Sequence, residues 1–142
     1  ETCLKLREAV GDIIGANVDP SHLFWQGINP VEAIKKLKGA IYHFHAKDTK
    51  IDEHNTAVNG VLDTKSYGDI LGRSWVFRTI GYGHGKEVWN DIISTLKAVG
   101  YDGSISIEHE DALMSPEEGL EKAIAFLKEV LIFKTAGEMW WA

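Results

Sequence analysis

Helical and strand-like patterns of apolar residues alternate along the chain. Residues 2–10 carry apolar positions at roughly helical spacing and Gly11 follows them, which predicts a short helix. Residues 13–18 form a compact apolar run that stops before Asp19 and Pro20, as a buried strand would.

The same order is repeated in the next segment. Asn29 and Pro30 are typical of a helix start, and Gly39 closes the helical pattern that follows them. Residues 40–46 then predict a strand. Helix, strand, helix and strand in this order indicate parallel strands joined by crossovers.

Residues 47–86 lack such a regular pattern. Asn59 and Gly60 stand between two apolar pairs and predict a two-residue hairpin, and residues 75–77 predict a short extended segment. A loop of this length inside a compact domain is usually a lid or a binding surface, although an irregular surface excursion is the alternative.

Regular structure resumes at Lys86. The pattern predicts a helix over residues 86–99 that ends at Gly100, a strand over 103–107, and a last helix that starts at Ser115 and Pro116. Two tryptophans, Trp140 and Trp141, end the chain. They either dock onto the same subunit or form an oligomer contact.

Composition narrows the class of protein. The 142 residues are enough for one domain with a real core, and no boundary divides 1–142. A net charge of −6 disfavours nucleic acid as a partner, and the single Cys3 rules out an internal disulfide. No apolar run approaches the ~20 residues of a membrane span, and no signal peptide is recognisable. We therefore expect a cytoplasmic protein without a membrane partner.

Acidic and imidazole side chains follow the predicted strands. Asp19, His45 and Glu108 each come at or after the end of an apolar run. The carboxyl ends of parallel strands meet at one edge, so these three side chains can reach one ion. A mixed set of carboxylates and imidazole suits Mn, Mg, Co or Zn as a divalent metal cofactor. Histidines on a strand are, however, as often core or surface residues as metal ligands.

Four segments together resemble a known family. They are Asn-Val-Asp-Pro-Ser-His-Leu (17–23), His-Phe-His-Ala-Lys-Asp (43–48), Phe-Arg-Thr-Ile-Gly-Tyr-Gly (77–83) and Ser-Ile-Glu-His-Glu-Asp (106–111). In this order they are similar to the C-terminal part of the xylose isomerase-like TIM barrel superfamily, the sugar phosphate isomerase/epimerase group. The resemblance implies an α/β fold, a partial (β/α)8 TIM barrel made of about the last three βα units.

The resemblance also implies roles for individual residues. Asp19, His45 and Glu108 match the family's metal ligands, and Glu108 matches its catalytic acid or base beside the carbonyl. His22 and Arg78 match residues that bind the substrate, a sugar or sugar phosphate. Lys47 and Asp48 belong to the motif in a supporting role.

The chain departs from the family in size. A full barrel needs about 250 residues and eight strands, and the family's first Glu ligand, on its fifth strand, is absent here. We therefore expect a homo-oligomer or a fragment of a longer chain. The expected function is a metal-dependent sugar or sugar-phosphate isomerase or epimerase. The alternatives are an inosose dehydratase-like lyase, a non-catalytic half-barrel that binds metal or self-assembles, and, less favoured by the acidic charge, DNA repair of the endonuclease IV type.

Overall fold

The computed structural model describes residues 1–141. In chain order its elements are α1 (Thr2–Val10), β1 (Ala16–Val18), α2 (Pro20–Phe24), α3 (Pro30–Lys36), β2 (Ile41–Ala46), β3 (Asp48–Ile51), α4 (Glu53–Asn59), β4 (Trp75–Arg78), α5 (Lys86–Ala98), β5 (Ile105–Ile107) and α6 (Pro116–Val130).

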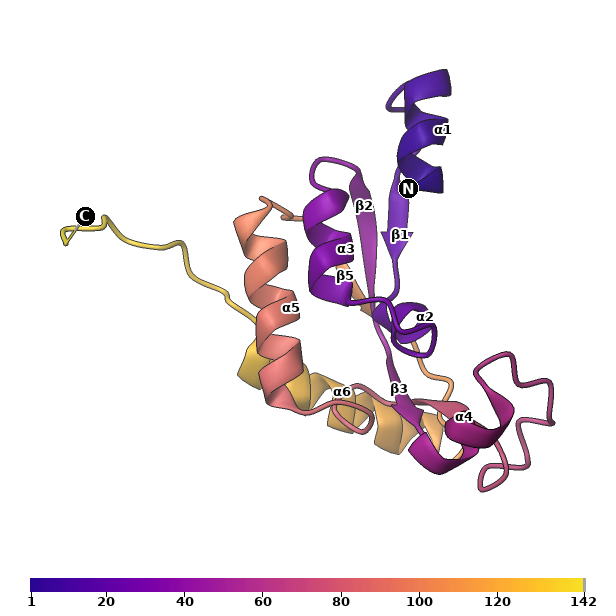
Figure 1. Cartoon of the computed structure of the whole chain (residues 1–142). Coiled ribbons are helices and arrows are strands. Elements are labelled where there is room, and N and C mark those ends of the chain that lie inside the picture. The colour runs from indigo at the N-terminus through magenta and orange to yellow at the C-terminus, as the bar shows by residue number, and fades with distance from the viewer. Residues whose placement is uncertain (142) are drawn as a thin grey trace.

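Three parallel strands form the centre of the fold. β2 lies between β1 and β5 and pairs with both in parallel. Helices α3 and α5 lie side by side on one face of these strands, and α6 packs against α5 (Figure 1). Crossover helices on one face of a parallel sheet are the arrangement of a barrel segment. The predicted α/β fold, a partial barrel with parallel strands, is confirmed.

The core lies between this sheet and the helices. Its fully buried side chains include Phe44 of β2, Ile34 of α3, and Trp89 and Ile92 of α5. The register of β1 on β2 shifts once, because Ala16 pairs with Ile41 and Asn17 with His43. Tyr42 is the extra residue of this bulge.

Most of the predicted helix boundaries are confirmed. Gly11 ends α1 with a φ of 84°, a conformation that glycine adopts without strain. The Asn29 side chain accepts hydrogen bonds from two backbone N–H groups at the start of α3. The Ser115 side chain accepts a hydrogen bond from one backbone N–H group at the start of α6. The first strand is shorter than expected, since it begins only at Ala16 and Ile13 is exposed.

The segment 47–86 is where the sequence prediction was partly wrong. Asn59 and Gly60 do not form a hairpin. Asn59 is the last residue of α4, and Gly60 (φ 71°) donates its N–H to the carbonyl of Thr56. The side chain of Asp52 accepts a hydrogen bond from the N–H of Asn55 and so caps the start of α4. The Asn-Gly pair therefore ends a helix instead of forming a hairpin turn. The extended segment is confirmed as β4, which pairs antiparallel with β3.

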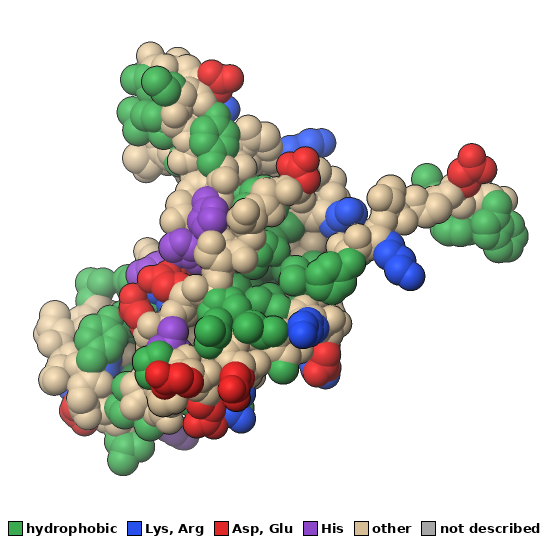
Figure 2. Space-filling view, turned by 180° about the vertical axis from the view of Figure 1, so that it is seen from behind, with side chains coloured by type: hydrophobic (Ala, Val, Ile, Leu, Met, Phe, Trp, Pro, Cys, Tyr) green, Lys and Arg blue, Asp and Glu red, His purple; other side chains and the backbone are tan. Residues whose placement is uncertain are grey.

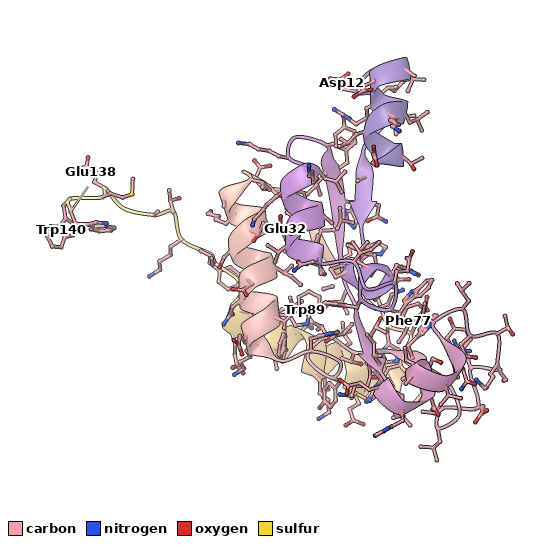
Figure 3. The ribbon with its side chains drawn as sticks, viewed as in Figure 1. Asp12, Glu32, Phe77, Trp89, Glu138 and Trp140 are labelled. Atoms are coloured by element: carbon pink, nitrogen blue, oxygen red, sulfur yellow. The ribbon has the colours of Figure 1, made fainter. Side chains whose placement is uncertain are left out.

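The C-terminal tail projects away from the helices (Figures 1 and 3). Trp140 and Trp141 are 88% and 69% exposed, so they do not dock onto the described part of the same chain. Their role in an oligomer contact remains a prediction. None of the helices within residues 1–141 is both long and apolar enough to cross a membrane.

A buried carboxylate joins the strands to the loop before α5. Asp48 is fully buried and accepts hydrogen bonds from the backbone N–H groups of Gly81 (3.1 Å), Gly83 (3.1 Å) and His84 (2.8 Å). The indole N–H of Trp89 reaches the same oxygen at 3.1 Å. A buried carboxylate is stable only with such partners. The loop conformation therefore depends on Asp48.

The close approach of this loop can be tested at one glycine. A Cβ on Gly83 would lie 2.2 Å from the carbonyl oxygen of Thr49 and 2.6 Å from Oδ1 of Asp48. We expect Gly83→Ala to lower the free energy of unfolding by about 1–3 kcal/mol, since the backbone must move to relieve the overlap. Urea unfolding followed by tryptophan fluorescence measures this difference.

Gly85→Ala is the matched control, because a Cβ at Gly85 meets no atom within 4 Å. Its cost should stay below about 1 kcal/mol, because alanine is a poorer N-cap residue than glycine but its Cβ overlaps no neighbouring atom. Equal unfolding curves for the two variants would contradict the proposed contact.

Candidate metal centre

The three predicted ligands come from three adjacent strand ends. Asp19 follows β1 directly, His45 lies near the end of β2, and Glu108 follows β5 directly. Asp19 is also the N-cap of α2, where its Oδ1 accepts hydrogen bonds from the N–H and the hydroxyl of Ser21 at 2.9 and 2.6 Å. This cap fixes the carboxylate, and its other oxygen, Oδ2, faces His45.

These three side chains converge. Nδ1 of His45 lies 2.7 Å from Oε2 of Glu108 and 3.5 Å from Oδ2 of Asp19. One ligand atom from each residue lies within 4.8 Å of the other two. Two carboxylate oxygens and one imidazole nitrogen at this spacing fit the donor set of a single divalent ion. Figure 2 shows the wider setting, a band of histidines beside acidic side chains on the face opposite that of Figure 1.

The polar face of the sheet continues beyond the ligands. Nε2 of His45 lies 3.2 Å from the side-chain nitrogen of Asn17, and Nε2 of His43 lies 2.7 Å from the hydroxyl of Ser106. The His43 and His45 rings meet edge to face at 5.4 Å. The contact with Asn17 orients His45 through the ring nitrogen that does not face the carboxylates.

Lys47 also belongs to this cluster. The sequence prediction had given Lys47 only a supporting role. Its Nζ lies 3.1 Å from Oε2 of Glu108, 3.4 Å from Oδ2 of Asp19 and 3.5 Å from Oε1 of Glu110. Burial alone would lower the pKa of this ammonium, but the neighbouring carboxylates outweigh burial and raise its pKa. The sequence contained a signal for this position. Lys47 is two residues beyond His45, and residues two apart on a strand share a face.

The ionisation of Glu108 suits a metal ligand. Burial alone would raise its pKa, but the hydrogen bond and charge of Lys47, followed by the charge of His45, lower the pKa below its ordinary value. Glu108 is therefore a carboxylate at neutral pH. Ligation of a cation requires that form.

His22 lies at the rim of the cluster. It is one turn beyond Asp19 on α2, and its Nε2 lies 3.7 Å from Oδ2 of Asp19. Half of the side chain is exposed, and its ring meets Phe77 edge to face at 5.1 Å. A substrate oxygen could reach His22 from solvent, so its role in substrate binding stays a prediction.

Arg78 is held by a different partner. Its Nε donates to both carboxylate oxygens of Asp111, at 3.1 and 3.0 Å, and Asp111 also accepts from the N–H groups of Thr79 and Leu113. Burial would raise the pKa of Asp111, but these two N–H groups and Arg78 together lower it. The structure thus places Arg78 in an ion pair rather than among the three ligands, and its contact with substrate stays a prediction.

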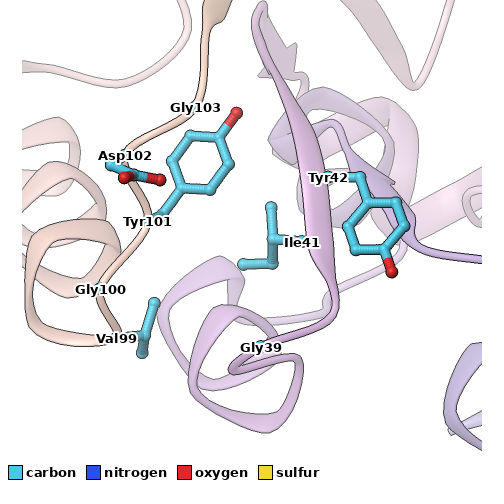
Figure 4. A pocket seen from close by; sticks show the side chains of 8 residues that line it. All are labelled: Gly39, Ile41, Tyr42, Val99, Gly100, Tyr101, Asp102 and Gly103. Atoms are coloured by element: carbon cyan, nitrogen blue, oxygen red, sulfur yellow. The ribbon is translucent and has the colours of Figure 1, made fainter. Parts of the chain in front are cut away.

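A cavity of about 290 Å³ lies elsewhere, between the turn before β2 and the loop before β5 (Figure 4). Ile41, at the start of β2, and Tyr101 and Gly103, before β5, are among its lining residues. It is therefore at the amino ends of the strands. In barrels of this type the chemistry takes place at the carboxyl ends, where the three candidate ligands converge.

Comparison with known proteins identifies the class. Residues 1–130 match the family described as xylose isomerase-like TIM barrel, and the chain belongs to this family. This family includes sugar isomerases and epimerases.

Two similar proteins are both much longer than this chain. An uncharacterized protein of Bacillus subtilis (strain 168), YfiH, is 42% identical over 131 residues, which are 92% of this chain and 42% of that protein. The crystal structure of a xylose isomerase domain protein from Planctomyces limnophilus superposes with a TM-score of 0.61 at 25% identity, over 89% of this chain and 39% of that one. The chain thus spans less than half the length of each.

The pair of Arg78 and Asp111 predicts a pH dependence of stability. The pKa of Asp111 is lower in the folded state than its ordinary value of 3.8. Its stabilisation is therefore fully present above that value and is lost as the pH falls through the lowered pKa. We expect Asp111→Asn to lower the free energy of unfolding by about 1–3 kcal/mol at pH 7, since Arg78 loses a charged partner. The difference from the wild type should shrink toward pH 2.

Urea unfolding at several pH values measures this difference. Asp102→Asn, which changes an exposed carboxylate, is the control and should show little difference from the wild type at neutral pH. A destabilisation of Asp111→Asn that stays constant down to pH 2 would contradict the assignment.

Proposed function

We propose that the chain supplies the metal-binding strand ends of a metal-dependent sugar or sugar-phosphate isomerase or epimerase. The observation that supports this most is the convergence of Asp19, His45 and Glu108 at the carboxyl ends of three parallel strands. In a barrel of this family those ends form the site of chemistry. Mn, Mg, Co or Zn would suit these ligands.

Each residue of the candidate site would have a separate role in the reaction. A bound divalent ion would supply polarisation of a carbonyl or hydroxyl oxygen of the sugar. Glu108, ionised at neutral pH, would move the proton on the carbon beside that carbonyl. His22, at the exposed rim, and Arg78 would bind substrate oxygens or a phosphate. Lys47 would neutralise part of the negative charge of Asp19 and Glu108.

Three alternatives use the same residues differently. An inosose dehydratase-like lyase would need the same ion and carboxylate but would expel water. A non-catalytic half-barrel would bind metal without turnover. DNA repair of the endonuclease IV type is the least favoured, because the net charge of −6 offers no general attraction for a polyanion.

The assembly of the site is also a proposal. Within the described residues β1 and β5 pair only with β2, so each has an edge free of strand pairing. Further strands would cover these edges. We propose that they come from a longer chain or from copies of this one, and that the protein works in the cytoplasm.

The test combines metal binding with proton exchange. Titration calorimetry should show that the wild-type chain binds Mn²⁺. The affinity should fall by about tenfold or more in each of the variants Asp19→Asn, His45→Ala and Glu108→Gln, because each variant removes one of the three ligands. With Mn²⁺ bound, incubation with ketoses in D₂O should place deuterium beside the carbonyl, as NMR detects. EDTA and Glu108→Gln should both abolish this exchange.

Glu121→Gln is the control for these variants, because it changes an exposed carboxylate on α6. It should bind Mn²⁺ as the wild type does. Mn²⁺ binding without any exchange would favour the non-catalytic alternative, and unchanged Mn²⁺ binding in all three ligand variants would refute the metal centre itself.

A further inference from the structure

The ammonium group of Lys47 occupies a special place beside the candidate metal centre. It contacts Oδ2 of Asp19 and Oε2 of Glu108, at 3.4 and 3.1 Å. These are the same two oxygens that approach Nδ1 of His45. A divalent ion bound to them would therefore lie close to a permanent positive charge.

The lysine has little freedom to leave this place. Its side chain is 1% exposed, and the residue stands between the last residue of β2 and the first of β3. The ammonium also lies over the ring of Phe77, 4.4 Å from its centroid. Such a contact adds a favourable cation–π interaction to the ion pairs. Burial, the ion pairs and this contact thus hold Nζ among the carboxylates.

The charges around Lys47 can be counted. Asp19, Glu108 and Glu110 contribute three negative charges, and Lys47 neutralises one of them. The remaining two negative charges match one divalent ion. A second ion would leave a net positive charge in a partly buried site beside the buried ammonium of Lys47, which is costly.

We propose that Lys47 is a built-in counter-ion that lowers the affinity of this site for divalent cations and limits it to one ion per chain. The inference rests on the proposed metal-binding function. Its physical basis is the repulsion between the fixed ammonium and a divalent ion on the same oxygens, which is strong at a few ångströms in a partly buried site. Glu110 acts in the opposite sense on the affinity for the ion. It is not one of the three candidate ligands, but its negative charge lies beside Lys47 and offsets the positive charge of the ammonium.

Two variants test this with Mn²⁺ as the probe, measured by titration calorimetry on the full chain. Lys47→Gln removes the positive charge, and we expect it to bind Mn²⁺ at least about tenfold more tightly than the wild type. Glu110→Gln removes a negative charge, and we expect it to bind about threefold or more weakly. Lys50→Gln, at an exposed lysine on β3, should bind as the wild type does.

Native mass spectrometry adds the number of ions, which should be one per wild-type chain. Equal or weaker binding by Lys47→Gln, or two ions in the wild type, overturns the proposal. If Lys47→Gln does not fold without metal, Glu110→Gln decides, and an unchanged affinity then overturns it. A wild-type chain that binds no Mn²⁺ refutes the proposed function. If the wild type binds Mn²⁺ but both Lys47→Gln and Glu110→Gln leave the affinity unchanged, only the role of Lys47 is refuted.

Discussion

The buried carboxylate of Asp48 is the interaction on which the rest of this structure depends. A buried charge is costly unless donors surround it, and here the donors come from the loop after β4 and from Trp89 of α5. Nδ1 of His84 adds a further contact at 2.8 Å. One side chain thus joins β3 to a loop and a helix that lie more than thirty residues further along the chain.

This interaction also reaches the candidate metal centre through α2. The ring of His84, held by Asp48, stacks on Phe24 at 3.7 Å, and the hydroxyl of Thr49 donates to the carbonyl of Ser21 at 2.6 Å. Both contacts fix the helix whose N-cap is Asp19. The position of Asp19, a candidate metal ligand, therefore depends on a carboxylate outside the candidate metal centre, as is common where outer partners orient ligands.

Periodicity and strand-end chemistry were enough to predict the parallel strands, the long helices and the convergence of Asp19, His45 and Glu108. Two results escaped the sequence prediction, the first because of a local helix cap and the second because of a tertiary contact. An Asn-Gly pair suits a hairpin or a helix end equally well, and only the cap at Asp52 decides between them. The sequence likewise could not assign Asp111 to Arg78, because these residues are 33 positions apart and meet only in the folded chain.

One property of the strands explains both the site and the open face of the sheet. Side chains two residues apart share a face, so His45 and Lys47 emerge on the side away from the buried Phe44 and Ala46. The same rule places Asp19 after Asn17, and Glu108 after Ser106. This face is polar, and its groups pair with one another, as His43 does with Ser106. A sheet covered by helices on one side tolerates an uncovered second side only if that side is polar. The candidate metal ligands are therefore also among the polar groups that keep this face compatible with solvent.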